Sequence, residues 1–488
     1  HACTVVCKSE HEVPVGVNRT WVKYIEHGKF PYSQRSFSVM RCNHCANAPC
    51  VEVCPVTALY TRDDGIVDFD KDRCIGCKAC TQACPYDALY IDPLSNTASK
   101  CNYCTHRVDN GLEPACVVVC PEHAIISGDM DDDTTEISQL LAENTVVARK
   151  TEKGTAPKLF YIEADEISLE PVATNRESGY MWSSQERGVG HNVAKDPSPS
   201  EKFDNSAART YDAPDKGVLW GWEVAAYLVT KGIAGGAVLI SIVLYWLGKG
   251  RQDMVLVSLF VGLVFLTITG ALLVKDLDRP DRFLSVLLRP QWRSWIVRGA
   301  YIITVFGGLM SAWVLGYYMG WMGSLTVLNY LIFPFAFLTV VYTAFLFAQA
   351  KGRDYWQNKM LPFHMFLHSI MVGGSAMLVL SYIMALEGVY WVRFVLLCST
   401  FAHLLYSVYE ALHKESNRDA RLASKMIHQG IFKNQFWLGV VLLGNILPVA
   451  LLFVNVSYMD LGAAVLVIIG AWIANHILVK APQLIPLS

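Results

Sequence analysis

The sequence predicts two unlike parts in one chain: a small α+β domain rich in cysteine, followed by an all-α membrane domain of about eight transmembrane helices. Fourteen of the fifteen cysteines lie before residue 121, and apolar runs of membrane-spanning length recur from residue 220 onward. The charges divide at the same place: residues 1–219 contain 22 Lys and Arg against 32 Asp and Glu, and residues 220–488 contain 19 against 11. Only 17% of residues are charged, so part of the chain is expected in lipid, and the net charge of −2 argues against nucleic-acid binding.

The cysteines form four groups, three of which end in Cys-Pro. The third group has the spacing of bacterial ferredoxins, in which three thiolates in a tight loop hold three corners of an iron–sulfur cube and the fourth ligates a second cluster. Zinc sites rarely show this spacing, and a disulfide scaffold is normally a small secreted domain. The groups are Cys3-x3-Cys7, Cys42-x2-Cys45-x4-Cys50-x3-Cys54, Cys74-x2-Cys77-x2-Cys80-x3-Cys84 and Cys101-x2-Cys104-x11-Cys116-x3-Cys120.

The first group is short by two cysteines, which we expect immediately before His1 and three residues earlier. With these two, sixteen thiolates would hold four [4Fe–4S] clusters. Pairing the groups as one with four and two with three gives a duplicated ferredoxin-like domain in which paired groups exchange their fourth cysteines. The expected ligand sets are Cys42, Cys45, Cys50 and Cys84; Cys54, Cys74, Cys77 and Cys80; Cys7, Cys101, Cys104 and Cys116; and Cys3 and Cys120 with the two upstream cysteines.

Residues 1–170 resemble the four-cluster electron-transfer subunits of molybdopterin oxidoreductase complexes, such as dimethyl-sulfoxide, polysulfide and nitrite reductases. The cysteine groups carry this resemblance. No cluster cysteine of the third or fourth group is replaced by Trp, so all four clusters can be cubanes. The resemblance implies a separate molybdopterin (bis-MGD) catalytic subunit as partner.

Residues 171–219 form a polar region rich in Pro, Ser, Asn and Gly between the two domains. One interpretation is a flexible tether between fused modules. The other is an ordered strap laid over a partner subunit or the membrane domain. Its anchors would be Tyr180, Met181, Trp182 and Tyr211.

Residues 220–488 contain eight runs long enough to cross a membrane, and tryptophans lie near their expected ends. An even number of spans places both ends of this domain on the side that carries the cysteine-rich domain. The expected spans are 223–248, 254–275, 296–319, 325–350, 361–387, 390–413, 435–457 and 459–480.

This half resembles the NrfD/polysulfide-reductase family of membrane subunits. The resemblance covers about residues 218–480 and implies a quinone-binding (quinone or menaquinone) anchor, usually without haem, fused here to the iron–sulfur subunit. The motifs that carry it are Trp220-Gly-Trp222, Lys231-Gly232, Asp276-Leu-Asp-Arg-Pro280 with Arg282-Phe283, Arg289-Pro-Gln-Trp-Arg-Ser-Trp295, Lys351-Gly-Arg-Asp354 and Pro362-Phe-His364.

Ionisable and polar residues within or at the ends of spans are functional candidates, because they are costly in lipid. Tyr342 resembles the aromatic hydroxyl of the fourth span that contacts quinone in the family. The other candidate quinone residues are Glu223, Tyr227, Asp276, Arg279 and His364. The alternative for each is interfacial packing or a buried hydrogen bond.

His364 and His368, four residues apart, together with His403 on the next span, also raise the question of haem. A bis-histidine haem needs two imidazoles that face each other from different helices, which His368 and His403 could supply. The resemblance to haem-free proteins argues against haem and favours structural or proton-handling histidines.

The expected function is electron transfer and membrane anchoring, with the protein acting as the subunit that links quinone to the catalytic subunit. No nucleotide-binding loop is present in the sequence. The alternatives are a proton-translocating subunit like those of alternative complex III, with Lys231, Glu387 and Glu410 in its path, and a purely structural anchor. A higher oligomer of the complex is compatible with either function.

The expected location is the inner (plasma) membrane, with several spans. Loops on the cluster side hold fifteen Lys and Arg, whereas the opposite side holds three, Lys249, Arg251 and Arg393. The positive-inside rule therefore predicts a cytoplasmic iron–sulfur domain. The alternative is export of this domain through a twin-arginine leader upstream of His1.

Overall fold

The computed structural model describes residues 1–174, 207–213 and 216–488. The chain divides into two compact units. We call the first the cysteine-rich unit; it contains His1–Leu219 together with Ala350–Arg353 and Gln483–Ser488. The second, the helical unit, contains Trp220–Gln349 and Asp354–Pro482. Two short segments from the C-terminal half of the sequence thus belong to the first unit.

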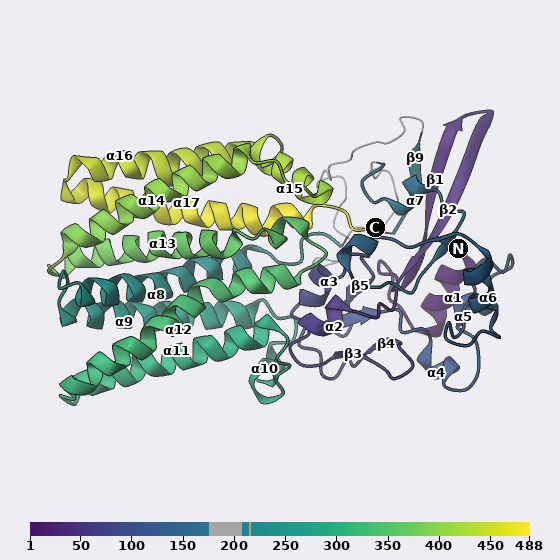
Figure 1. Cartoon of the computed structure of the whole chain (residues 1–488), viewed down its shortest axis with the longest axis horizontal. Helices are drawn as coiled ribbons and strands as arrows, with labels where there is room; N and C mark the ends of the chain where they lie inside the picture. The colour runs from purple at the N-terminus through teal and green to yellow at the C-terminus, as the bar shows by residue number, and fades with distance from the viewer. Residues whose placement is uncertain (175–206, 214–215) are drawn as a thin grey trace. The chain divides into compact units, whose positions relative to one another are not determined.

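The cysteine-rich unit consists of short helices and two-stranded hairpins (Figure 1). The helix α2 (Pro49–Val53) precedes the hairpin of β3 (Leu59–Thr61) and β4 (Val67–Phe69). The sequence of elements then repeats, with α3 (Ala79–Ala83) before β5 (Leu89–Asp92) and β6 (Thr97–Lys100). This internal repeat contains the second and third cysteine groups, which the sequence pairs with each other.

A three-stranded antiparallel sheet, in the order β2-β1-β9, lies outside this repeat. Its strands are β1 (Thr20–Lys29), β2 (Tyr32–Arg41) and β9 (Ala208–Tyr211). Tyr211 pairs with Tyr24 and packs against His1, so it is part of this unit. Tyr180, Met181 and Trp182, the other expected anchors of a strap, lie outside the described residues. The remaining elements are α1 (Ala2–Glu10), α4 (Thr105–Val108), α5 (Ala115–Val118), α6 (Glu136–Glu143), β7 (Val146–Val147), η1 (Thr151–Lys153), β8 (Tyr161–Ile162) and α7 (Glu166–Leu169).

The helical unit has eight helical segments long and apolar enough to cross a membrane, which confirms the expected all-α membrane domain. They run as long, roughly parallel helices in Figure 1. The segments are α8 (Trp222–Trp246), α9 (Gln252–Lys275), α11 (Trp295–Tyr318), α12 (Met322–Gln349), α13 (Leu361–Ile383), α14 (Val389–Leu412), η5 (Gln435–Ile446) with α16 (Leu447–Val454), and α17 (Ser457–Gln483). Shorter elements are η3 (Pro280–Arg282), α10 (Ser285–Leu288), η4 (Asp354–Gln357) and the amphipathic α15 (Arg418–His428).

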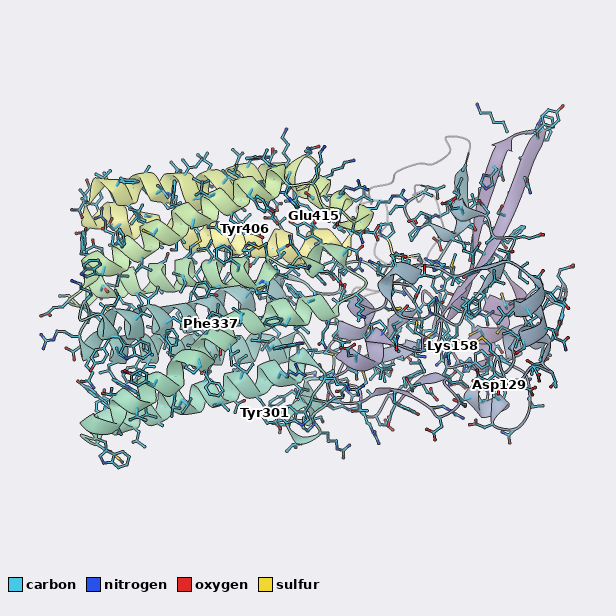
Figure 2. The ribbon with its side chains drawn as sticks, in the orientation of Figure 1. Asp129, Lys158, Tyr301, Phe337, Tyr406 and Glu415 are labelled. Carbon is cyan, nitrogen blue, oxygen red and sulfur yellow. The ribbon has the colours of Figure 1, made fainter. Side chains whose placement is uncertain are left out.

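The helix α8 is central, because its residues contribute to two separate apolar cores. One core joins α8 to α9, α11 and α12, and the other joins it to α13, α14, α16 and α17. Gly236 of α8 lies so close to α13 that an added Cβ would be 1.9 Å from the carbonyl oxygen of Ser369. Small residues permit such close helix contacts in membrane proteins, where apolar surface gains little by leaving lipid. Figure 2 shows how side chains such as Tyr301 of α11 and Phe337 of α12 cover this unit.

Candidate functional site

Three of the cysteine groups have the same backbone conformation. The residue before the second cysteine has a positive φ in each, at His44 (42°), Gly76 (69°) and Tyr103 (61°). The third residue after each Cys-Pro cysteine also has a positive φ, and these residues are Thr57, Asp87 and His123. Non-glycine residues seldom adopt this conformation, so its repetition shows that the three loops are built to one plan.

These turns direct backbone amides at sulfur atoms. The amide of Ala58 donates to Cys54 Sγ, and that of Ala124 donates to Cys120 Sγ, both at 3.2 Å. The amide of Ala88 makes the corresponding hydrogen bond to Cys84. Hydrogen bonds to ligand sulfurs stabilise thiolates and help to set the potential of an iron–sulfur cluster.

Cysteines from different groups lie near one another in the folded unit, and the expected ligand sets stay a prediction. A cavity in the cysteine-rich unit is lined by Cys54, Cys74, Cys77 and Cys80. The Cys50 thiol has the thiols of Cys42, Cys45 and Cys84 among its electrostatic neighbours. The Cys7 thiol has Cys101, Cys104 and Cys116 as neighbours, and Cys3 lies in one apolar group with Cys116 and Cys120.

The chemistry of these sites fits a cluster better than bare thiols or a single ion. Burial raises the pKa of Cys45 to about 12 and that of Cys104 to about 11, so without a cation the thiols stay protonated at neutral pH. The spacing of Cys74, Cys77, Cys80 and Cys84 is that of bacterial iron–sulfur proteins and is rare among zinc sites.

Buried cations accompany these thiols. Arg41 donates to Cys116 Sγ at 3.3 Å. Lys100 is fully buried and donates to the carbonyl oxygens of Val67 and Cys101. Because thiolate-ligated clusters are anionic, buried positive charge offsets part of the cost of placing them inside the unit.

In the helical unit, four residues of α8 and α12 form a buried polar group, which we call the Lys231 group. It consists of Tyr227, Lys231, Tyr342 and Thr343. Lys231 Nζ donates to Thr343 Oγ1 at 2.5 Å and lies 4.7 Å from the centre of the Tyr342 ring. Tyr227 hydrogen-bonds to Thr343 and is within electrostatic range of Tyr342 and Asp276. The structure thus gathers two of the expected quinone residues, Tyr227 and Tyr342, around a lysine, with Asp276 within electrostatic range of Tyr227.

Glycine in α11 provides the space for Tyr342. A Cβ at Gly299 would lie 2.2 Å from Tyr342 Cε2. Gly308, nine residues further along the same helix, has open space at the equivalent position. Gly299 therefore fixes where the Tyr342 ring can lie.

The other expected quinone residues have different partners. Glu223 forms an ion pair with Lys275 at 3.5 Å, and Arg279 pairs with Asp281 at 2.9 Å. His364 packs against His368 and His403 instead.

Sequence reasoning did not place Lys231 or Thr343 with quinone. The available signal was a lysine in the middle of an apolar span, because a buried charge in lipid is costly and so marks a functional position. Its partner Thr343 could not be identified, because the two residues are 112 positions apart and nothing in the sequence shows which faces of α8 and α12 meet.

Comparison with known proteins agrees with this division of the chain. Residues 34–130 match the family described as 4Fe-4S dicluster domain, and residues 213–486 match the family described as Polysulphide reductase, NrfD. The second match covers more than half of the 488 residues.

Curated relatives match the cysteine-rich part of the chain. The iron-sulfur subunit of a putative dimethyl sulfoxide reductase of Halobacterium salinarum is 40% identical in an alignment of 194 positions that covers 34% of this chain and 74% of that protein. A tetrathionate reductase subunit of Salmonella typhimurium is 43% identical over 186 residues, 37% of this chain and 74% of its own length. A polysulfide reductase chain of Wolinella succinogenes is 43% identical over 164 residues, 33% of this chain and 86% of its own length. The protein therefore belongs to the NrfD polysulphide reductase family, with a 4Fe-4S electron-transfer domain fused in front of its membrane domain.

Proposed function

We propose that this chain carries electrons between membrane quinone and a separate molybdopterin (bis-MGD) catalytic subunit, and anchors that subunit to the membrane. The relatives named above are subunits of reductases, which supports a catalytic partner chain. Four [4Fe–4S] clusters, when bound, would supply one-electron carriers along the cysteine-rich unit. The cysteine sets would hold them, and the amides of Ala58, Ala88 and Ala124, which donate to Cys54, Cys84 and Cys120, would stabilise ligand sulfurs.

The Lys231 group is the observation that carries the quinone assignment. A quinone oxygen needs a hydrogen-bond donor and a source or acceptor for its proton. The Lys231 ammonium and the hydroxyls of Tyr227 and Tyr342 are such donors, and all three residues are buried. Asp276, at the C-terminal end of α9, lies in electrostatic range of Tyr227 and supplies a carboxylate for proton exchange.

The chain itself connects this group to a cysteine loop. Tyr342 lies seven residues before the end of α12, and Gly352 follows three residues after that end. At 1.5 Å per helical residue and at most 3.8 Å per extended residue, Tyr342 and Gly352 are no more than about 22 Å apart. The Gly352 amide donates to the carbonyl of Gln82 at 3.1 Å, two residues before Cys84. We therefore assign the Cys42, Cys45, Cys50 and Cys84 cluster as the one that exchanges electrons with quinone.

The direct test is anaerobic reduction of the purified full-length protein by a quinol analogue, followed through the cluster absorption. We expect Tyr342→Phe and Asp276→Asn each to slow reduction about three- to tenfold, because each removes one hydrogen-bonding or proton-exchanging group. Gly299→Ala should act like Tyr342→Phe by displacing the ring, whereas Gly308→Ala should leave the rate unchanged. Equal rates in all four variants would contradict the assignment.

The alternative proton-translocating function receives less support from the residues named for it. Glu387 forms an ion pair with Arg251 at 3.0 Å, and both side chains are about two-thirds exposed. Glu387 is therefore a surface residue of the turn between α13 and α14. Glu410 accepts a hydrogen bond from Tyr355, and Lys231 belongs to the quinone group.

For orientation, we propose a cytoplasmic cysteine-rich unit. Four spans separate Leu219 from Ala350 and four more separate Arg353 from Gln483, so all three segments of this unit return to one side. Arg393 does not count as a loop charge, because it lies within α14 and pairs with the buried Asp460 at 3.1 Å. Lys249 and Arg251 remain on the opposite side, which strengthens the Lys/Arg asymmetry.

A reporter fused after Ser488 tests this orientation. An enzyme that folds only in the cytoplasm should be active there, and one that folds only in the periplasm should be inactive. The reverse pattern would place the cysteine-rich unit outside the cytoplasm.

A further inference from the structure

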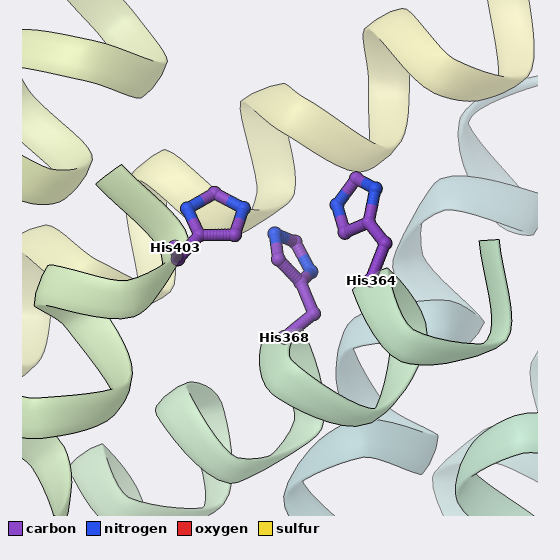
Figure 3. Close-up of side chains that lie close together, drawn as sticks. All are labelled: His364, His368 and His403. Atoms are coloured by element: carbon purple, nitrogen blue, oxygen red, sulfur yellow. The ribbon is translucent and has the colours of Figure 1, made fainter. Parts of the chain in front are cut away.

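Three histidines meet inside the helical unit. His364 and His368 lie on successive turns of α13, and His403 faces them from α14 (Figure 3). Their exposed fractions are 7%, 6% and 2%, and one ring nitrogen from each lies within 4.8 Å of the other two. The quinone assignment to the Lys231 group does not use them.

The hydrogen bonds around His403 fix which of its nitrogens is available. Asn445, in the π-helical η5, donates from Nδ2 to the carbonyl oxygen of Val440 at 2.6 Å. Its Oδ1 therefore faces His403 Nδ1 at 2.9 Å and can only accept, so Nδ1 carries the proton. His403 Nε2 is left with a free lone pair. Such an oriented second partner is typical of metal-binding histidines.

The other two imidazoles have unused nitrogens as well. Nε2 of His364 and Nε2 of His368 are buried and have no hydrogen-bond partner within the part of the chain that the structure describes. Buried polar nitrogens are normally paired, so these two require an explanation. Several neutral imidazoles that converge in a closed space form the donor set preferred by zinc and copper.

Haem does not fit this arrangement. The ring centres lie 5.0 Å apart for His368 and His403, and 5.5 Å apart for His364 and His403. A porphyrin would have to pass between two facing imidazoles, and rings packed this closely leave no gap for it. A single ion needs much less space, since metal–nitrogen bonds of about 2.0–2.1 Å place ligand nitrogens about 3.4 Å apart.

We propose that His364, His368 and His403 bind one late first-row transition-metal ion, Zn²⁺ or copper, with three imidazole nitrogens. Three protein ligands leave an open position for water or another small ligand. Tyr406, labelled in Figure 2, packs its ring 4.9 Å from that of His364 and closes one side of the site. His403, Tyr406 and Glu410 follow one another at three- and four-residue spacing on α14, so they share a helix face, and Glu410 is an electrostatic neighbour of Tyr406.

Elemental analysis of the purified full-length protein tests the proposal. We expect about one zinc or copper ion per chain in addition to the iron. X-ray absorption at the edge of that metal should show nitrogen neighbours at about 2.0 Å, whereas zinc misplaced in a cysteine site would show sulfur at about 2.3 Å. The element found decides between zinc and copper.

Variants separate a metal site from ordinary packing. His403→Gln should lose the bound ion, and Asn445→Ala should weaken its binding about ten- to a hundredfold because His403 is no longer oriented. His413→Ala, at an exposed histidine directly after α14, should keep the ion. The cluster absorption serves as the folding control for each variant, and Asn445→Ala keeps the test open if His403→Gln does not fold. Absence of metal, sulfur-only coordination, or full metal content in His403→Gln would each overturn the proposal.

Discussion

Replacement of Lys231 by methionine is expected to slow quinol oxidation about ten- to a hundredfold without changing the cluster spectrum. A hydrogen bond to a charged group contributes about 1.5–3 kcal/mol, and each 1.4 kcal/mol corresponds to a tenfold change in rate. Lys231 Nζ donates to Thr343 Oγ1 and lies over the Tyr342 ring, so its removal takes both the charge and the donor from the Lys231 group. The rate is measured by stopped-flow reduction of the clusters with a quinol analogue.

The same variant should not lose stability. Lys231 is 1% exposed, and replacing a buried charge with an apolar side chain of similar length is often neutral or stabilising. Thermal unfolding should therefore occur at the wild-type temperature or above it. Lys249 is an exposed lysine just after α8, and Lys249→Met is the matched control. This variant should oxidise quinol at the wild-type rate. Normal turnover in Lys231→Met would remove the Lys231 group from the quinone site.

Replacement of Cys84 by alanine is expected to remove one cluster and to stop electron flow from quinol. The iron content should fall by about four atoms per chain, because each [4Fe–4S] cluster contributes four. The Cys84 thiol is an electrostatic neighbour of Cys45 and Cys50. Iron, acid-labile sulfide and electron paramagnetic resonance measure the loss.

Cys398 provides the control for this experiment. It is exposed on α14, outside the cysteine groups, and Cys398→Ala should keep its full iron content. Gly352→Ala should have an iron content between those of Cys84→Ala and the wild type. Its added Cβ would lie 2.6 Å from the backbone carbonyl oxygen of Gln82 and 2.8 Å from that of Cys84. Unchanged iron in Cys84→Ala would contradict the proposed ligand set.

The sequence predicts the architecture well because the two strongest signals are local. The cysteine spacing indicates the structure of one loop, and a run of about 20 apolar residues indicates one membrane-spanning helix. Each signal comes from residues close together in the sequence, so neither prediction depends on distant contacts. The repeated positive φ at His44 and Tyr103 was not predictable in the same way. Neither residue is glycine, the residue type that usually indicates a positive φ, so the residue types do not predict these turns.

Groups assembled from different helices were predicted only in part. His364 and His368 lie four residues apart, which places them on one face, but the approach of His403 depends on how α13 and α14 pack. The sequence therefore named the three histidines together but did not show that all three rings meet. Gln82 and Gln483, which form a hydrogen bond, are 401 positions apart in the sequence. A periodic pattern predicts only local structure, so it could not predict this contact.

The discontinuous cysteine-rich unit has a consequence for biosynthesis. Arg149 donates to the carbonyl of Leu487, and Arg353 donates to that of Ile485, so residues 483–488 take part in its packing. During translation the ribosome releases these residues only after all eight spans, whereas the cysteine groups emerge first. The cysteine-rich unit therefore cannot complete its packing until all eight spans have been synthesised and inserted into the bilayer. Maturation of the electron carrier and membrane integration of the anchor are thereby coupled in time within a single polypeptide.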